Sequence, residues 1–344
     1  MRAKTRSTKG SEVNTTKAID VVGNYANAEV HDRPSALEER IRAQQQRLLS
    51  DLKLHYDFIV CGSGSSGSVA VGANVCSCTA RLEVVLSLGA INTPRVLMQS
   101  GMGDEAESGR LGIPVVHHLP GVGCNFQDHF LIARCLWEYP EPCAPRNNAT
   151  EAVTFWKSDP SLDTPDMQLA LIELPYVSAA LATYNPPAHA WGLCPGIVRP
   201  KSRGHLRLMG VNPLDPTTIV ANTVSAPDDL KAAVRAVDLG RTIGNAVPLR
   251  PLVQRAVMPT GLQGAARETF VRDGALSYWH QSCTAKMGRD AMSVVDNSLA
   301  VYGIAGLRIA DAAIMPRVTT GNTMAPCVVI GERAARILRT EHKL

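Results

Sequence analysis

The sequence has few aromatic residues and no long apolar run. Only 5% of its 344 residues are Phe, Trp or Tyr, and no apolar stretch approaches the roughly 20 residues that a membrane-spanning helix needs. The formal net charge of +4 is small for this length, and no basic stripe is interleaved with aromatic residues. We therefore expect no membrane span and no nucleic-acid partner.

The sequence also lacks a disulfide framework and a metal-binding pattern. Of its nine cysteines only Cys76 and Cys78 lie close together, and C-x-C alone is not a zinc spacing. The first ten residues are basic but lack the apolar core of a secretory signal. These features predict reduced thiols, no metal site and a cytoplasmic protein.

The composition is that of a globular protein, with 45% hydrophobic residues in a chain long enough for two domains. Near the N-terminus, Ser35 and Glu38 have the spacing of a capping box. The apolar positions that follow at helical spacing are Leu37, Ile41, Leu48 and Leu52. Residues 1–54 are therefore predicted to be an N-terminal tail and helix.

A glycine-rich turn follows in YDFIVCGSGSSG, residues 56–67. The uninterrupted run from Phe58 to Val60 predicts a strand buried on both faces. Gly62, Gly64 and Gly67 match G-x-G-x-x-G, in which the glycines permit a tight turn, a close approach to pyrophosphate and helix packing. The alternative is an ordinary Gly/Ser loop, but the preceding strand favours a dinucleotide site.

The turn alone does not choose between NAD and FAD. Both need an acidic residue for the ribose at the carboxyl end of the second strand, about 20 residues later. Glu83 lies at a suitable distance, but it precedes the apolar run Val84–Leu86 instead of following it. We therefore reject Glu83 as a ribose ligand.

The rest of the chain alternates between two patterns. Residues 81–98 predict a strand, a turn at Gly89 and a helix that begins at Pro94 after the cap Thr93, and residues 111–129 predict an ordered loop. The middle part predicts strands in PDMQLALIEL and RGHLRLMG, and a helix over 226–244 capped by Ser225.

The C-terminal part returns to the first pattern. It predicts a short buried strand ending at Asp311 and a helix after Asn322. The apolar residues of that helix available for burial are Val328, Val329, Ala335 and Leu338. We interpret the middle part as a substrate domain inserted into a cofactor domain.

Several stretches together resemble the glucose-methanol-choline (GMC) oxidoreductase family of flavoenzymes. GAINTPRVLMQSGMG with LGIPVVHHLPGVGCNFQDH resembles the second signature of the family. YWHQSCTAKMG, VVDNSLAVYGIAGLRIADAAIMP and TTGNTMAPCVVIGERAA resemble its C-terminal signature, in the same order. The similarity extends over about residues 55–340.

The resemblance implies an α/β protein in which a Rossmann-like FAD-binding domain carries an inserted α+β substrate domain with an antiparallel sheet. The FAD-binding parts would be residues 55–140 and 276–344, and the substrate domain residues 150–275. The implied reaction is oxidation of the CH–OH group of a small-molecule alcohol, with hydride transfer to FAD, as in an alcohol oxidase or a choline dehydrogenase-like enzyme.

By the same resemblance His280 is the catalytic base and Asn322 orients the substrate oxygen. A lone histidine is otherwise more often structural, which is how we interpret His129, His117 and His118. The residues that the motif and the resemblance together place at the cofactor are Gly62, Ser63, Gly64, Gly67, Asp311, Ala312, Thr323 and Met324. For Asp311 the alternative is a strand-terminal turn cap.

The sequence departs from the family between Gly67 and Glu83. About a dozen residues stand where the fold needs a crossover and a ribose-binding strand end. We therefore expect an internally truncated, incomplete member. The hypotheses are a shortened flavin-dependent alcohol oxidoreductase, a non-catalytic remnant with impaired FAD binding and, third, a lyase with a structural flavin.

Overall fold

The computed structural model describes residues 39, 40, 43, 47, 53–62, 78–132, 134–145, 149–150 and 152–344. The chain divides into two compact units, Met1–Leu52 and Lys53–Leu344. In the first unit the described residues are Glu39, Arg40, Ala43 and Arg47, and all are helical. The predicted capping box and the apolar positions of this helix lie outside the described residues.

The second unit contains a three-stranded parallel sheet built from both ends of the unit. Its strands are β1 (His55–Cys61), β2 (Thr79–Leu86) and β14 (Leu307–Ile309), in the order β1-β2-β14. β1 is an edge strand, and Val60 is 61% exposed. The expectation that this strand is buried on both faces was wrong, because its residues are exposed or at most half-buried.

Helix α2 (Gly89–Gln99) follows β2 and begins five residues before the predicted start at Pro94. The first turn is held from elsewhere in the unit, since the backbone N–H of Gly89 donates to Asp311. Pro94 has no N–H for the carbonyl of Ala90, and the hydroxyl of Thr284 donates to that oxygen instead at 2.6 Å. Thr93 therefore lies inside the helix and does not cap it.

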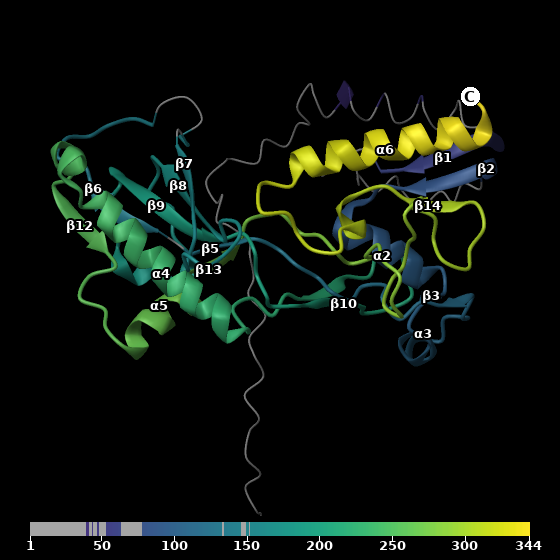
Figure 1. The fold of residues 1–344 in the computed structure, drawn as a ribbon, viewed down its shortest axis with the longest axis horizontal. Helices are drawn as coiled ribbons and strands as arrows, with labels where there is room; N and C mark the ends of the chain where they lie inside the picture. Colours follow the sequence, from purple (N-terminus) through teal and green to yellow (C-terminus); the bar gives the residue numbers. More distant parts are fainter. Residues whose placement is uncertain are drawn as a thin grey trace, which may run out of the picture. The chain divides into compact units, whose positions relative to one another are not determined.

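The C-terminal helix α6 (Met324–His342) lies alongside β1, β2 and β14 in Figure 1. Its buried residues are Ala334 and Ile337. Of the residues named as available for burial, Val328 and Val329 are 63% and 66% exposed, Ala335 is exposed and Leu338 is half-buried. The N-terminal half of α6 thus presents an apolar face that no described residue covers.

The unit also contains a seven-stranded, largely antiparallel sheet. Its strands are β5 (Phe130–Ile132), β6 (Cys135–Glu138), β7 (Val153–Trp156), β8 (Met167–Ile172), β9 (Ala190–Ile197), β12 (Arg255–Met258) and β13 (Ala275–Ser277). The central strand β9 is buried along its whole length. Trp137 and Trp191 stack at 4.8 Å in its core, next to helices α4 (Pro227–Gly244) and α5 (Ala265–Gly274).

Helix α4 confirms the predicted position but not the predicted cap. Its N-cap is Ala226, with Pro227 in the first turn and no side-chain cap. The hydroxyl of Ser202 accepts the backbone N–H of Ala226, and Asp229 in turn accepts from Ser202. The loop that carries Ser202 therefore holds the residue before this helix, and Ser225 does not cap it.

The remaining described elements are short. They are β3 (Met102–Gly103), α3 (Glu105–Leu111), β4 (His117–His118), η1 (Ala179–Tyr184), β10 (His205–Leu208), β11 (Thr217–Val220), η2 (Val247–Leu252) and η3 (Ala312–Ile314). Most of residues 111–129 form an ordered loop, as predicted. Within the described residues, no helix is long and apolar enough to cross a membrane and no group of side chains is suited to hold a metal ion.

Candidate active site

The loop that ends in Gln127, Asp128 and His129 pairs with the segment that carries His280. Gln127 and Ser282 exchange backbone hydrogen bonds of 3.2 and 2.9 Å, and the N–H of Tyr278 donates to the carbonyl of His129. Some 150 residues separate the two segments in the sequence, as the spacing of 151 between the two histidines shows. This pairing brings two signature stretches of the sequence into one site.

His280 contacts His129 directly. Their Nδ1 atoms lie 3.0 Å apart, and the rings meet edge to face. The Nε2 atom of His129 lies 2.7 Å from the carbonyl oxygen of Thr319. Burial, and then the neighbouring His280, lower the pKa of His129 to about 4, and burial also lowers the pKa of His280. Both imidazoles are therefore neutral at neutral pH.

Asp128 fixes the backbone that carries His280. Its carboxylate accepts the N–H of His280 at 2.9 Å and the hydroxyl of Ser277 at 2.6 Å. Burial raises the pKa of Asp128 to about 6, although these hydrogen bonds act in the opposite direction. The carboxyl group is thus a backbone anchor whose charge is costly to bury.

Tyr278 connects His280 to Asn322. The rings of Tyr278 and His280 lie 4.6 Å apart, and the Tyr278 hydroxyl contacts the side chain of Asn322. The amide nitrogen of the buried Gln168 in β8 lies 3.4 Å from both the Tyr278 hydroxyl and Oδ1 of Asn322. The two predicted catalytic residues therefore belong to one polar cluster.

Asn322 is exposed, and it immediately precedes the N-terminus of α6. Thr323 occupies the N-cap position, but its hydroxyl accepts no hydrogen bond from the N–H groups of the first turn. These N–H groups can therefore donate to other partners. Thr323 is buried and Met324 is 75% exposed. This helix end lies beside the polar cluster, because Asn322 belongs to both.

Asp311 is a buried turn cap. Its carboxylate accepts from Thr93 at 2.5 Å, from Gly89 at 3.0 Å and from Ala313 at 2.7 Å, and it begins η3 together with the buried Ala312. Burial raises its pKa, against these hydrogen bonds. The capping role weighed for Asp311 is confirmed, and it ties β14 to the start of α2.

Gly62 adopts a backbone conformation that favours glycine. Its φ is +110°, and an added Cβ would lie 2.2 Å from the carbonyl oxygen of Ser87. The turn therefore requires glycine here for both its dihedral angle and its close approach to β2. Ser63, Gly64 and Gly67 lie outside the described residues.

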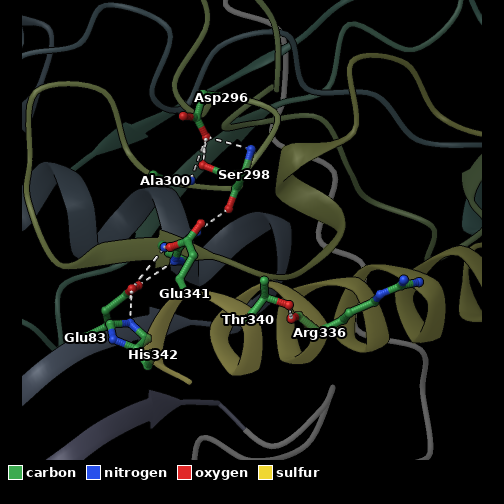
Figure 2. Close-up of polar contacts among 9 residues, drawn as sticks. Glu83, Asp296, Ser298, Ala300, Arg336, Thr340, Glu341 and His342 are labelled. Carbon is green, nitrogen blue, oxygen red and sulfur yellow. Dashed lines mark hydrogen bonds and ion pairs between the residues drawn. The ribbon is translucent and has the colours of Figure 1, made fainter. Parts of the chain in front are cut away.

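Glu83 lies in a buried ion-pair network instead of a ribose site, in line with its rejection above. Its carboxylate binds Nε and Nη2 of Arg308 at 2.5 and 2.9 Å and Nε2 of His342 at 2.6 Å. Figure 2 shows Glu83, Glu341 and His342 gathered at the C-terminal end of α6. Arg308 also pairs with Glu341, so the network fastens α6 to β2 and β14.

A cavity of about 510 Å³ lies elsewhere, lined by α3, β10 and neighbouring loop residues that include Asp104, Cys124 and Arg207. None of the predicted site residues lines it. Arg207 pairs there with Glu107 at 4.0 Å, and Asp104 caps the first turn of α3. We therefore place the candidate chemistry at His280 and not in this cavity.

The sequence did not reveal three members of the polar cluster. Tyr278 opens the signature stretch YWHQSCTAKMG but was given no role, Gln168 carries no motif of its own, and His129 was interpreted as a structural residue. The only signal for His129 was its place in the QDH end of a signature stretch, and distance along the chain concealed the contact with His280.

Comparisons with known proteins agree with these features. Two models described as GMC oxidoreductase match residues 58–131 and 200–331. An alcohol dehydrogenase [acceptor] of Pseudomonas putida is 34% identical over 285 residues, which are 74% of this chain and 51% of the relative. An oxygen-dependent choline dehydrogenase of Stenotrophomonas maltophilia is 35% identical over 289 residues, which are 76% of this chain and 51% of the relative.

A solved structure of pyridoxine 4-oxidase from Mesorbium loti superposes with a TM-score of 0.71 at 30% identity, covering 74% of this chain and 50% of that one. The fold is thus that of a mixed helix-and-sheet oxidoreductase. The chain belongs to the GMC oxidoreductase family. It spans about half the length of the curated relatives that it matches.

Proposed function

We propose that the chain is a shortened FAD-dependent oxidoreductase that oxidises the CH–OH group of a small-molecule alcohol. The observation that supports this proposal best is the polar cluster, in which His280 reaches Asn322 through Tyr278 at the start of α6. Relatives named as alcohol and choline dehydrogenases point to the same class of reaction. The cytoplasmic location stays a prediction.

The described residues fit an FAD at this place. Gly62 supplies the tight turn at the end of β1 with which a dinucleotide site opens, and a Cβ there would collide with the backbone at Ser87. Thr323 and Met324 place an uncapped helix end, with its partial positive charge, beside the cluster. When bound, FAD supplies the acceptor for the hydride.

The side chains of the cluster then divide the work. A neutral imidazole of His280 takes the hydroxyl proton of the alcohol as the hydrogen on the carbon leaves with its electron pair. The exposed amide of Asn322 orients the substrate oxygen. The N–H groups at the start of α6 stabilise negative charge that accumulates next to them.

We assign the two sheets to different domains. The parallel sheet with α2 and α6 belongs to a Rossmann-like FAD-binding domain that is incomplete, and the antiparallel sheet belongs to an inserted substrate domain. The boundaries 55–140, 150–275 and 276–344 stay a prediction. Strands β5 and β6 precede residue 150 and nevertheless join the antiparallel sheet.

A second candidate is a non-catalytic remnant that binds FAD poorly. The exposed apolar residues support it, since Val60 in β1 and Met324, Val328 and Val329 in α6 are more than 60% exposed. A longer segment between Gly67 and Glu83, of the length expected for the family, could cover these apolar side chains. The interval between Gly67 and Glu83 is too short to provide it.

Flavin content distinguishes the two candidates. The 344-residue chain is purified and its bound FAD is quantified by absorbance, beside a version in which a full-length family segment is inserted between Ser68 and Arg81. Stoichiometric FAD and alcohol-dependent reduction in the chain as it stands would support the shortened enzyme. FAD in the extended version alone would support the remnant.

A further inference from the structure

His129 has features of a residue that acts on His280. It is completely buried, its Nε2 lies 2.7 Å from the carbonyl oxygen of Thr319 and its Nδ1 lies 3.0 Å from His280. The backbone of Val198 also hydrogen-bonds to this ring. His280 is only partly buried, and among the described residues its Nε2 has no hydrogen-bond partner. The ring of His129 is therefore held at both nitrogens, whereas the ring of His280 is held only at Nδ1.

Of the two backbone groups at this ring, Thr319 has the larger effect on the pKa of His129, and its carbonyl determines which ring nitrogen carries the proton. A carbonyl oxygen only accepts hydrogen bonds, so the 2.7 Å contact requires a proton on Nε2 of His129. A neutral imidazole with Nε2–H has a bare Nδ1, which is an acceptor. The 3.0 Å contact between the Nδ1 atoms then requires that His280 donates from its own Nδ1.

We infer that His129 is a positioning residue that holds His280 as the Nδ1–H tautomer, so that the unprotonated Nε2 of His280 is left free to accept a proton. The role of this Nε2 as the base rests on the proposed function, whereas the tautomer does not. The chain of hydrogen bonds ends at a carbonyl, so His129 orients His280 and does not pass a proton onward.

A proton that His280 accepts stays on that residue. His129 remains neutral in its buried position, and its bare Nδ1 continues to accept the Nδ1–H of an imidazolium at His280. This hydrogen bond is charge-assisted only after the proton has arrived, so it becomes stronger at that moment. The hydrogen bond thus favours the protonated state of His280, although no carboxylate of the described residues contacts its ring.

Nitrogen-15 NMR of the histidine-labelled full chain tests the tautomer without FAD or turnover. Magic-angle-spinning spectra of sedimented protein at neutral pH separate protonated from bare ring nitrogens, and a His280→Ala spectrum assigns the signals. We expect His280 to be protonated at Nδ1 and bare at Nε2, with a scalar coupling between the two Nδ1 atoms across the hydrogen bond. A folded chain with Nε2–H on His280, or without that coupling, would overturn the inference.

Two variants separate the positioning role from a structural one. His129→Asn keeps an acceptor near the place of Nδ1, whereas His129→Gln keeps only a donor near Nε2 toward Thr319. We expect His280 to keep its tautomer in His129→Asn and to shift toward Nε2–H in His129→Gln, with unchanged circular dichroism in both. An identical tautomer in the two variants would contradict the inference, and the coupling in the unsubstituted chain decides it if either variant misfolds.

The consequence for the reaction is measured separately. In a preparation that oxidises an alcohol, His129→Gln lowers turnover by between about 10-fold and the roughly 10²-fold that loss of the base costs, and His129→Asn restores most of it. A chain that never turns over refutes the proposed function and leaves the NMR result standing. Normal turnover with a changed tautomer would remove His129 from the mechanism.

Discussion

Removing Arg308 is expected to release the C-terminal helix from the parallel sheet. Arg308 and Glu83 are 7% exposed, and the guanidinium binds both carboxylate oxygens of Glu83 and the carbonyl of Ser298 at 2.5 Å. Arg308→Met keeps the length of the side chain but leaves Glu83 buried with His342 alone. Breaking a buried ion pair by removing one partner costs about 3–5 kcal/mol of the free energy of unfolding.

Urea denaturation followed by circular dichroism measures this loss, with Arg81→Met as the matched control. Arg81 pairs with Asp57 at 2.8 Å on the same sheet, but both side chains are more than 60% exposed, so its removal costs at most about 1 kcal/mol. Equal losses in the two variants would refute the argument that burial gives the Arg308 network its importance.

The same experiment has a predicted pH dependence. Burial alone would raise the pKa of Glu83, but the hydrogen bonds and positive charges of Arg308 and His342 outweigh burial and lower it below its usual value. A lowered pKa contributes stability that is complete above the unfolded value of about 4.3 and is lost as the pH falls through the folded value. The difference between Arg308→Met and the unsubstituted chain should therefore be largest at neutral pH and shrink below about pH 4.

Three further predictions concern the site and its surroundings. In any active preparation His280→Ala lowers alcohol turnover by roughly 10²-fold with flavin retained. Because burial lowers the pKa of His280, the midpoint of the rise of kcat/KM with pH should lie below the ordinary histidine value of about 6.5; unchanged turnover, or a midpoint above that value, would contradict this role. Gly62→Ala places a Cβ 2.2 Å from the carbonyl oxygen of Ser87, so thermal unfolding should show that the free energy of unfolding falls by more than about 1 kcal/mol, and the amount of bound flavin should fall as well. In the control Gly109→Ala in α3 the new Cβ meets nothing within 4 Å, so this variant should be as stable as the unsubstituted chain or more stable. Val329→Lys on the exposed face of α6 should change the free energy of unfolding by less than about 0.5 kcal/mol and raise solubility in a sedimentation assay, unlike Ile337→Lys at a position that is 9% exposed; equal destabilisation would mean that the face is covered.

Local sequence predicted the elements better than their boundaries. The strands at β1, β2, β8, β10 and β14 and the helices α2, α4 and α6 all occur where periodicity placed them. The start of α2 and the cap of α4 were wrong because residues far along the chain hold these helix ends, Asp311 for α2 and Ser202 for α4. A capping rule reads only the neighbouring residues and cannot register such partners.

Burial was the least predictable property. The apolar run of β1 suggested two covered faces, yet Val60 is exposed and Phe58 and Ile59 are only half-buried. The apolar positions of α6 suggested burial of Val328 and Val329, yet both are exposed. Periodicity shows which residues are able to be buried, whereas the tertiary structure decides which of them meet another surface.

The sequence by itself determined the family, because many fixed positions in the right order carry that information, and it determined that Gly62 and His280 belong to recognisable motifs. Only the tertiary structure decided which side chains contact one another. It assigned Glu83 to Arg308 and His342, Asp311 to the first turn of α2, and His129 to His280. The physical reason is that a proton on a histidine ring depends on the acceptor within about 3 Å, and that distance is set by the pairing of two segments far apart in the chain.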